Sequence, residues 1–345
     1  MKDYLIVGLG LAGLSIAEEL HKRQKSFHVL AEPGKNASKV AGGVINPLIL
    51  KRFTLSWSAD EFIPEAEKFY TRIEKRLGIS IFRKLPIYRK IKSAEEQNNW
   101  YVAADKPDLK KYIDDELKKI PLPNSPFHFG KVNCTSLIDT STLLEAYSEH
   151  LSRHNQLRFE TFDYNRLKIG TNEISYKDYR AKKIIFCEGM GIQNNPFFHH
   201  LPLIGNKGEY LIVSTPQLPQ DAILKTAIAF IPLGKGFYKV GATYSRSYKN
   251  DQPEERSKHF LITKLEELID GPYEIVNREA GIRPTVLDRR PLLGSHPRHS
   301  RLLICNGFGS HGLMIAPTAA KWLLNFDLHQ KDLPKAVNVH RYFKD

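Results

Sequence analysis

The sequence predicts an α/β fold in which a first domain is interrupted by a second, α+β domain built on a mixed β-sheet. The prediction rests on three observations. The chain opens with an apolar run at 4–7, a glycine-rich turn at 8–13 and an amphipathic helical pattern, which indicate a strand, a tight turn and a helix. Two further glycine-bearing loops, at 187–191 and 307–312, follow apolar strand-like runs. Most of the remaining chain is rich in short β-like runs.

The glycines of the first turn each have a physical task. Gly8 makes the tight turn, Gly10 lets the backbone approach a pyrophosphate, and Gly13 lets the helix and strand pack closely. A pyrophosphate then lies at the helix N-terminus, against Leu11 and Ala12. The pattern predicts a Rossmann-like unit that binds a dinucleotide.

Glu32 strengthens this interpretation. It directly follows the second strand-like run, 27–31, and lies nineteen residues after Gly13. An acidic side chain near this spacing accepts hydrogen bonds from ribose hydroxyls and would repel a phosphorylated ribose. FAD and NAD use the same turn, so the unit alone leaves both open.

Length and composition limit the classes of function that the chain can have. At 345 residues the chain has room for about two domains. No stretch reaches the roughly twenty apolar residues of a membrane span, so we expect a cytoplasmic protein with no membrane span. Its three cysteines are far apart and indicate neither disulfides nor a metal site. The net charge of +13 would attract acidic small molecules or nucleic acid, or serve solubility.

The first third of the chain offers a second ligand contact and a helix. The small residues Gly42 and Gly43 let the backbone approach a flat ligand. Apolar residues recur at helical spacing over 60–77, and Gly78 is the expected stop.

In the middle of the chain the expected secondary structure changes twice. From 79 to 129 short β-like runs indicate an inserted piece of the second domain. A helix is then expected over 139–150, with a capping box from Thr142 to Glu145. Residues 183–187 form a buried strand that opens into the loop bearing Gly189.

The last part is β-rich over 203–283, with a helix expected at 254–269. A strand at 302–305 leads into the third glycine loop and a helix over 313–326, with Pro317 expected in its first turn. The division that follows assigns 1–78, 130–200 and 285–345 to the dinucleotide domain and 79–129 and 201–284 to the substrate domain.

With these motifs placed, the whole chain resembles the D-amino-acid oxidase (DAO) superfamily of FAD enzymes, which includes glycine and sarcosine oxidases. The resemblance rests on the first turn with Glu32, on 41–43, on 281–294 and on 307–312. It implies a FAD-binding domain of the glutathione-reductase type. Within the superfamily, 309–317 is similar to the FAD domain of the bifunctional enzyme that processes the carboxymethylaminomethyl group on the wobble uridine of tRNA.

The resemblance implies cofactor contacts at the third loop. There Gly309 and Gly312 would lie against the flavin, with the N–H groups of Leu313 and Met314 at the helix N-terminus stabilising negative charge on the reduced ring. His311 would contact flavin or substrate, or is an ordinary surface histidine.

Two further residues gain roles from the resemblance. Arg283 would grip a substrate carboxylate, unless it pairs with Asp288 as a loop clamp. Lys239 lies where sarcosine oxidases keep a lysine that promotes reaction with oxygen, unless it is a surface lysine. Gly281 stands where sarcosine oxidases carry the cysteine that bonds flavin, so non-covalent FAD is expected.

The combined prediction is a FAD-dependent oxidoreductase that takes hydride from the carbon beside the amine of an amino acid or N-substituted glycine and releases an imine to hydrolysis. One alternative is the same chemistry on the wobble uridine of tRNA, which the +13 charge favours. Others are an NAD-dependent dehydrogenase and a non-catalytic flavoprotein or binding module. The sequence predicts no particular oligomeric state.

Overall fold

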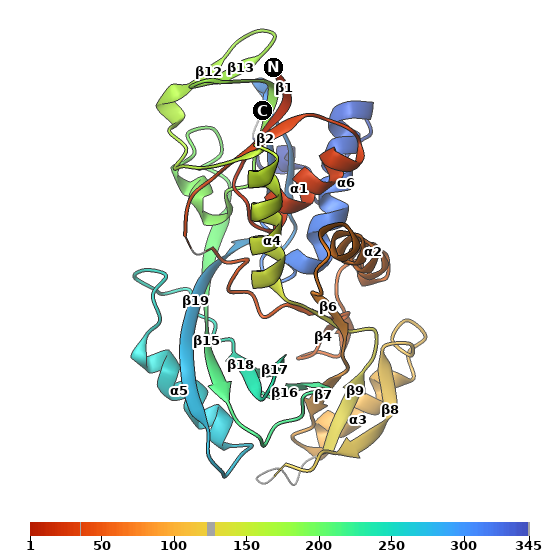
Figure 1. Ribbon diagram of the computed structural model, residues 1–345. Helices are drawn as coiled ribbons and strands as arrows, with labels where there is room; N and C mark the ends of the chain where they lie inside the picture. The colour runs from red at the N-terminus through yellow and green to blue at the C-terminus, as the bar shows by residue number, and fades with distance from the viewer. Residues whose placement is uncertain (35, 123–127, 344–345) are drawn as a thin grey trace.

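Two eight-stranded β-sheets lie at opposite ends of the molecule within the described residues, which are 1–34, 36–122 and 128–343 (Figure 1). This computed structural model is a mixed α/β fold, as predicted. No helix in the described part of the chain is long and apolar enough to cross a membrane.

The first sheet has a parallel core. The strand β1 (Lys2–Val7) lies between β2 (Phe27–Ala31) and β14 (Tyr179–Phe186), and β14 also pairs in parallel with β21 (His299–Asn306). Parallel strands end at the same edge of a sheet. The glycine loops that follow β1, β14 and β21 therefore meet at one edge, although they are far apart in the sequence.

The other strands of this sheet are short or peripheral. They are β11 (Leu157–Phe159), β12 (Leu167–Ile169), β13 (Ile174–Tyr176) and β20 (Leu292–His296).

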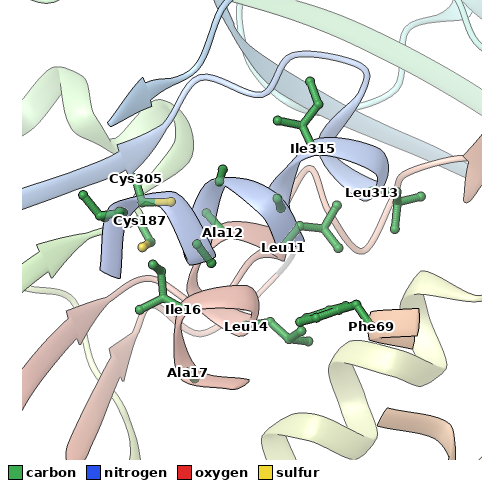
Figure 2. Close-up of a cluster of buried hydrophobic side chains, with 14 of the residues drawn as sticks. Leu11, Ala12, Leu14, Ile16, Ala17, Phe69, Cys187, Cys305, Leu313 and Ile315 are labelled. Carbon is green, nitrogen blue, oxygen red and sulfur yellow. The ribbon is translucent and has the colours of Figure 1, made fainter. Parts of the chain in front are cut away.

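Helices α1 (Leu11–Lys22), α2 (Ala59–Leu77) and α6 (Gly312–His329) pack together beside this sheet (Figure 1). Figure 2 shows their core, with Leu11 and Leu14 of α1 near Leu313, Ile315 and Phe69. The free thiols of Cys187 and Cys305 lie beside one another in the same core. The predicted helix at 60–77 is confirmed as α2, which ends at Gly78 in the left-handed conformation with φ of 67°.

Two local predictions are wrong. The helix α4 (Thr140–Arg153) is capped by Asp139, which accepts from the Thr142 N–H at 3.0 Å, so the predicted box from Thr142 to Glu145 does not form. The physical reason is that Asp139 starts the helix three residues earlier in the chain than the predicted cap.

Pro317 lies in the second turn of α6, not the first, because the helix begins at Gly312. Proline has no N–H, so the Leu313 carbonyl loses its helical donor. The hydroxyl of the buried Tyr70 donates to that carbonyl instead, at 3.0 Å.

The second sheet is mixed and strongly curved (Figure 1). Its order is β19 (Glu274–Val286), β15 (Leu203–Ser214), β18 (Phe237–Gly241), β17 (Ala229–Gly234), β16 (Ile223–Lys225), β7 (Ile87–Lys90), β9 (His128–Val132) and β8 (Ile113–Lys119). The long strands β15 and β19 run back toward the first sheet. Helices α3 (Ala94–Ala104) and α5 (Glu255–Glu266) flank it, and α5 is shorter than the helix expected at 254–269.

Short strands complete the fold: β3 (Val44–Ile45), β6 (Phe82–Lys84) and β10 (Ser136–Ile138) form one small sheet, and β4 (Leu48–Ile49) pairs with β5 (Thr54–Leu55). The strand β9 spans the predicted domain boundary between 129 and 130, and the predicted segments reach residues 123–127 and 344–345, which lie outside the described residues. The division into two domains stays a prediction.

Candidate functional site

A cavity of about 770 Å³, called the central cavity below, lies between the glycine loops and the second sheet. Its volume is typical of sites for small molecules and cofactors. The predicted site residues that line it are Gly8, Gly10, Leu11, Ala12, Glu32, Gly42, Gly43, Gly189, Arg283, Gly309, His311, Gly312 and Leu313. Three others, Gly13, Lys239 and Met314, do not line it. The described residues hold no group of His, Cys, Asp or Glu side chains that could bind a metal ion.

The first turn brings main chain to the cavity wall. Gly8 has φ of +99°, and a Cβ there would collide with the carbonyl of Cys187. A Cβ on Gly13 would collide with the carbonyl of Gly8, so Gly13 serves close packing of helix and strand. At the start of α1 the Leu11 N–H donates to the hydroxyl of Ser38 at 3.0 Å. The N-terminus of α1 thus lines the cavity directly after Gly8 and Gly10, which suits a pyrophosphate.

Two carboxylates lie at this end of the cavity. Glu32 is exposed after β2 and accepts a hydrogen bond from Thr161 at 3.3 Å. Glu188, directly after Cys187, is hydrogen-bonded by Tyr164 and by Asn195 Nδ2. Burial raises the pKa of Glu188 to about 7, although both hydrogen bonds act in the opposite direction. Glu32 is accessible to a ribose, whereas Glu188 is a half-buried acid that sequence reasoning missed.

The third glycine loop, 307–312, is hydrogen-bonded to β19 of the second sheet. The Gly309 N–H donates to the Pro284 carbonyl at 2.8 Å, and Thr285 forms a bridge with Phe308. These bonds tie the loop to β19. The N-terminus of α6, which begins at Gly312, therefore lies near Arg283.

Arg283 has an unused donor. Its Nη1 atom is buried without a hydrogen-bond partner, while Nη2 lies 3.5 Å from the hydroxyl of Tyr210. The guanidinium also lies 4.8 Å from the ring centroid of Tyr244 and packs over Gly208, where any Cβ would collide with it. A buried guanidinium nitrogen without an acceptor is costly, and a bidentate anion would satisfy it.

The expected alternative for Arg283 does not form. Asp288 accepts a hydrogen bond from Arg341 Nε at 2.9 Å and does not pair with Arg283. Pro284, the residue after Arg283, lies within β19 opposite Gly205. The strand, and not a turn, presents the guanidinium.

Lys239 is neither on the cavity wall nor on the surface. Its ammonium donates to the carbonyls of Val40 and Ala41 at 3.3 and 3.4 Å and forms an ion pair of 2.8 Å with Glu279. It also lies 5.3 Å from the ring centroid of Tyr210. These contacts hold the chain segment that carries Gly42 and Gly43 to the cavity.

Sequence reasoning also missed two residues of the second sheet that line the cavity, Tyr210 and Lys225. Strand alternation places Ile223 and Lys225 on one face, but only the pairing of β16 with its neighbours shows that this face is the cavity wall.

The sequence-based comparisons agree with this geometry. A sequence model of the DAO family, described as FAD dependent oxidoreductase, matches residues 3–325. The chain is 24% identical over 348 residues to a glycine oxidase from Bacillus licheniformis, covering 94% of this chain and 93% of that protein. It is also 24% identical over 360 residues to the tRNA 5-methylaminomethyl-2-thiouridine biosynthesis bifunctional protein MnmC of Azoarcus sp., covering 92% of this chain but 56% of that protein.

Solved structures share the fold. An iminodiacetate oxidase from Chelativorans sp. superimposes with a TM-score of 0.78 at 17% identity, covering 98% of both chains. A glycine oxidase from Bacillus cereus gives a TM-score of 0.78 at 19% identity, covering 96% of both chains.

Proposed function

The chain belongs to the DAO family of FAD-dependent oxidoreductases, and from this premise we propose that it oxidises the C–N bond of an amino acid or an N-substituted glycine. When bound, FAD supplies the redox chemistry by accepting hydride from the carbon beside the amine. The chain's own residues bind and orient the two molecules in the central cavity.

The cavity offers a place for each part of the cofactor. The first turn and the N-terminus of α1 would hold the pyrophosphate, Glu32 the ribose, and the N-terminus of α6 the flavin. The cysteine on the described cavity wall is Cys187, whose thiol pKa is raised by burial. A protonated thiol and Gly281 both support non-covalent FAD.

The proposed substrate class rests on the position of Arg283. Its guanidinium lines the cavity beside the loop that leads into α6, and one nitrogen of that group is buried without a hydrogen-bond partner. A substrate carboxylate would supply the missing acceptor. The amine of an α-amino acid or N-substituted glycine is one carbon away from that carboxylate.

The test is Arg283→Lys, which keeps the charge but loses the planar fork. We expect KM for a carboxylated amine to rise roughly tenfold to a hundredfold, with FAD content unchanged. The control is Arg278→Lys on the same strand, since Arg278 pairs with Glu255 and does not line the cavity. An unchanged KM for the Arg283 variant would overturn the proposed substrate class.

A second candidate is oxidation of the carboxymethylaminomethyl group of wobble uridine in tRNA. The net charge of +13 and the similarity to MnmC favour it, while the chain spans about half the length of that relative. Flavin reduction by free amino acids, with none by tRNA carrying this group, would argue against it.

The roles of His311 and Lys239 stay predictions. His311 lines the cavity with an exposed side chain, and desolvation by the surrounding protein, with a smaller contribution from Arg289, lowers its pKa, which supports a neutral imidazole that can donate or accept. The contacts of Lys239 support a positioning role for the 40–43 segment more directly than a contact with oxygen. A cytoplasmic location is likewise a prediction.

A further inference from the structure

Lys225 places a second cation on the wall of the central cavity. It is the last residue of β16 and lies on the same strand face as Ile223, which also lines the cavity. In the neighbouring strand β7 its register partner is Arg89. The side chain is half-buried, so its charge is only partly solvated.

No carboxylate neutralises this amine among the described residues. Its hydrogen-bond acceptor is the carbonyl of Ala227, at 3.3 Å. The nearby Arg89 pairs with Glu96, which occupies that carboxylate. Burial lowers the pKa of Lys225 to about 8, with Arg89 and Lys92 acting in the same direction. The site is therefore short of negative charge.

The carboxylates that do line the cavity lie elsewhere. They are Glu32, Glu188 and Asp251, and none of them is within ion-pair distance of Lys225 or Arg283. The cavity thus holds two cations, on different strands, without a protein anion for either.

The two cations are far apart in the sheet. Three strands, β15, β18 and β17, lie between β19 and β16. Across the sheet, Lys225 pairs with Ala229 of β17, Ala229 with Gly241 of β18, and Gly241 with Tyr210 of β15, so these residues are level with one another. Tyr210 pairs in turn with Glu279 of β19, which precedes Arg283 by four residues. At ~4.8 Å between strands and ~3.3 Å per residue, the two Cα atoms lie on the order of 20 Å apart along the sheet. Cations on strands this far apart in the sheet can each bind an anion of their own.

The wall between the cations is largely apolar. Ala229, Gly241 and Tyr210 line it level with Lys225, whereas Ile223, Ile231 and Ile87 continue the apolar surface on the side of Lys225 away from Arg283. Such a surface fits an alkyl chain or a flat ring and leaves charge to the two ends.

We propose that the substrate is an elongated carboxylated amine with a second anionic group, a carboxylate or a phosphate, that binds Lys225 while the first carboxylate binds Arg283. The inference rests on the proposed function, because it takes Arg283 as the site of the first carboxylate. Lys225 is then a specificity-determining residue that selects the far end of the molecule.

The experiment uses three probes, N-hexylglycine, its ω-carboxylate and its ω-phosphate ester, with the FAD-loaded protein. We expect Kd for at least one ω-anion to be roughly tenfold lower than for N-hexylglycine. Lys225→Met should abolish this preference without changing Kd for N-hexylglycine, and Lys225→Arg should retain it. Lys92→Met is the matched control, since Lys92 is a neighbouring exposed cation that does not line the cavity.

The outcomes separate the two proposals. A preference for the carboxylate or for the phosphate supports the inference and identifies which anion binds. Equal Kd values for all three probes, or a preference that survives in Lys225→Met, overturn it, even where all three reduce the flavin. If no carboxylated amine reduces the flavin, the proposed function fails, whereas the Kd ratio still decides whether Lys225 binds an anion.

Discussion

The two ends of the central cavity are built in different ways. At the end that holds the first glycine turn, main chain and glycines of the loops after β1 and β14 make much of the wall. At the other end, side chains from several strands of the curved second sheet make the wall. Where main chain packs tightly against main chain, as at Gly8, an added side chain would collide with it. Where side chains make the wall, each of them can be replaced separately. We therefore expect substitutions at the first end to affect cofactor and stability, and those at the second to affect substrate.

The largest expected effect is that of Gly8→Ala at the first end. The backbone there has φ of +99°, and the added Cβ would meet the Cys187 carbonyl. We expect a loss of about 3 kcal/mol in the free energy of unfolding and loss of bound FAD, measured by denaturant titration and visible absorbance.

The control is Gly191→Ala on the same part of the wall. Its Cβ would make an ordinary contact of 3.5 Å with the Glu188 side chain. If the Gly8→Ala protein were as stable as the Gly191→Ala protein, the expected difference between the two ends of the cavity would be wrong.

Glu188→Gln tests the half-buried acid at the first end. The folded protein raises the pKa of Glu188 to about 7 from 4.5, so the folded chain keeps a proton that the unfolded chain releases. Stability from this group is present below about pH 4.5 and is lost as pH rises through about 7, by about 3 kcal/mol. The Glu188→Gln variant should lack this decline, because its amide can donate to Tyr164 and accept from Asn195.

Unfolding titrations at pH 5 and pH 8 would measure that difference. Parallel pH profiles for the wild-type and Glu188→Gln proteins would mean that Glu188 is ionised in the folded protein.

Glu32→Ala should weaken FAD binding by about 2 kcal/mol without unfolding the chain, because it removes an acceptor for ribose hydroxyls. Since Glu32 is exposed and its partner is the Thr161 hydroxyl, the stability cost should be small. Fluorescence titration of FAD gives the affinity. An unchanged Kd would place the ribose away from Glu32.

Gly208→Ala is the corresponding change at the second end. A methyl group there would push the Arg283 guanidinium aside. We expect KM for a carboxylated amine to rise roughly tenfold, an effect of about 1.4 kcal/mol, with normal FAD content. An amine without a carboxylate should show no change in KM. Loss of FAD from this variant would contradict the division of labour between the ends.

The same contrast explains what the sequence could predict. Gly8, Gly10, Gly13 and Glu32 lie within one strand–turn–helix–strand unit, so their spacing alone places them around a ligand. The helix α2 was predictable because its apolar spacing and Gly78 are local signals.

Features that depend on tertiary pairing were not predictable. Lys225 lines the cavity only because β16 pairs with β7 and β17, and no residue near Lys225 in the sequence indicates those partner strands. The predicted box from Thr142 to Glu145 failed for a different reason, since Thr142 is also a capping residue type and competes with Asp139 within one turn.

The strand order of the first sheet bears on how the protein is made. On the ribosome, β1 and its glycine turn emerge first, but Lys2 pairs with Ala181 of β14, and β14 in turn pairs with β21. The third glycine loop and α6 follow β21 and are therefore made after all three of these strands. Pairings so distant in sequence form late. Because Gly8 packs against Cys187 directly after β14, and the flavin end of the cavity needs α6, full-strength FAD uptake should begin only after α6 has been synthesised.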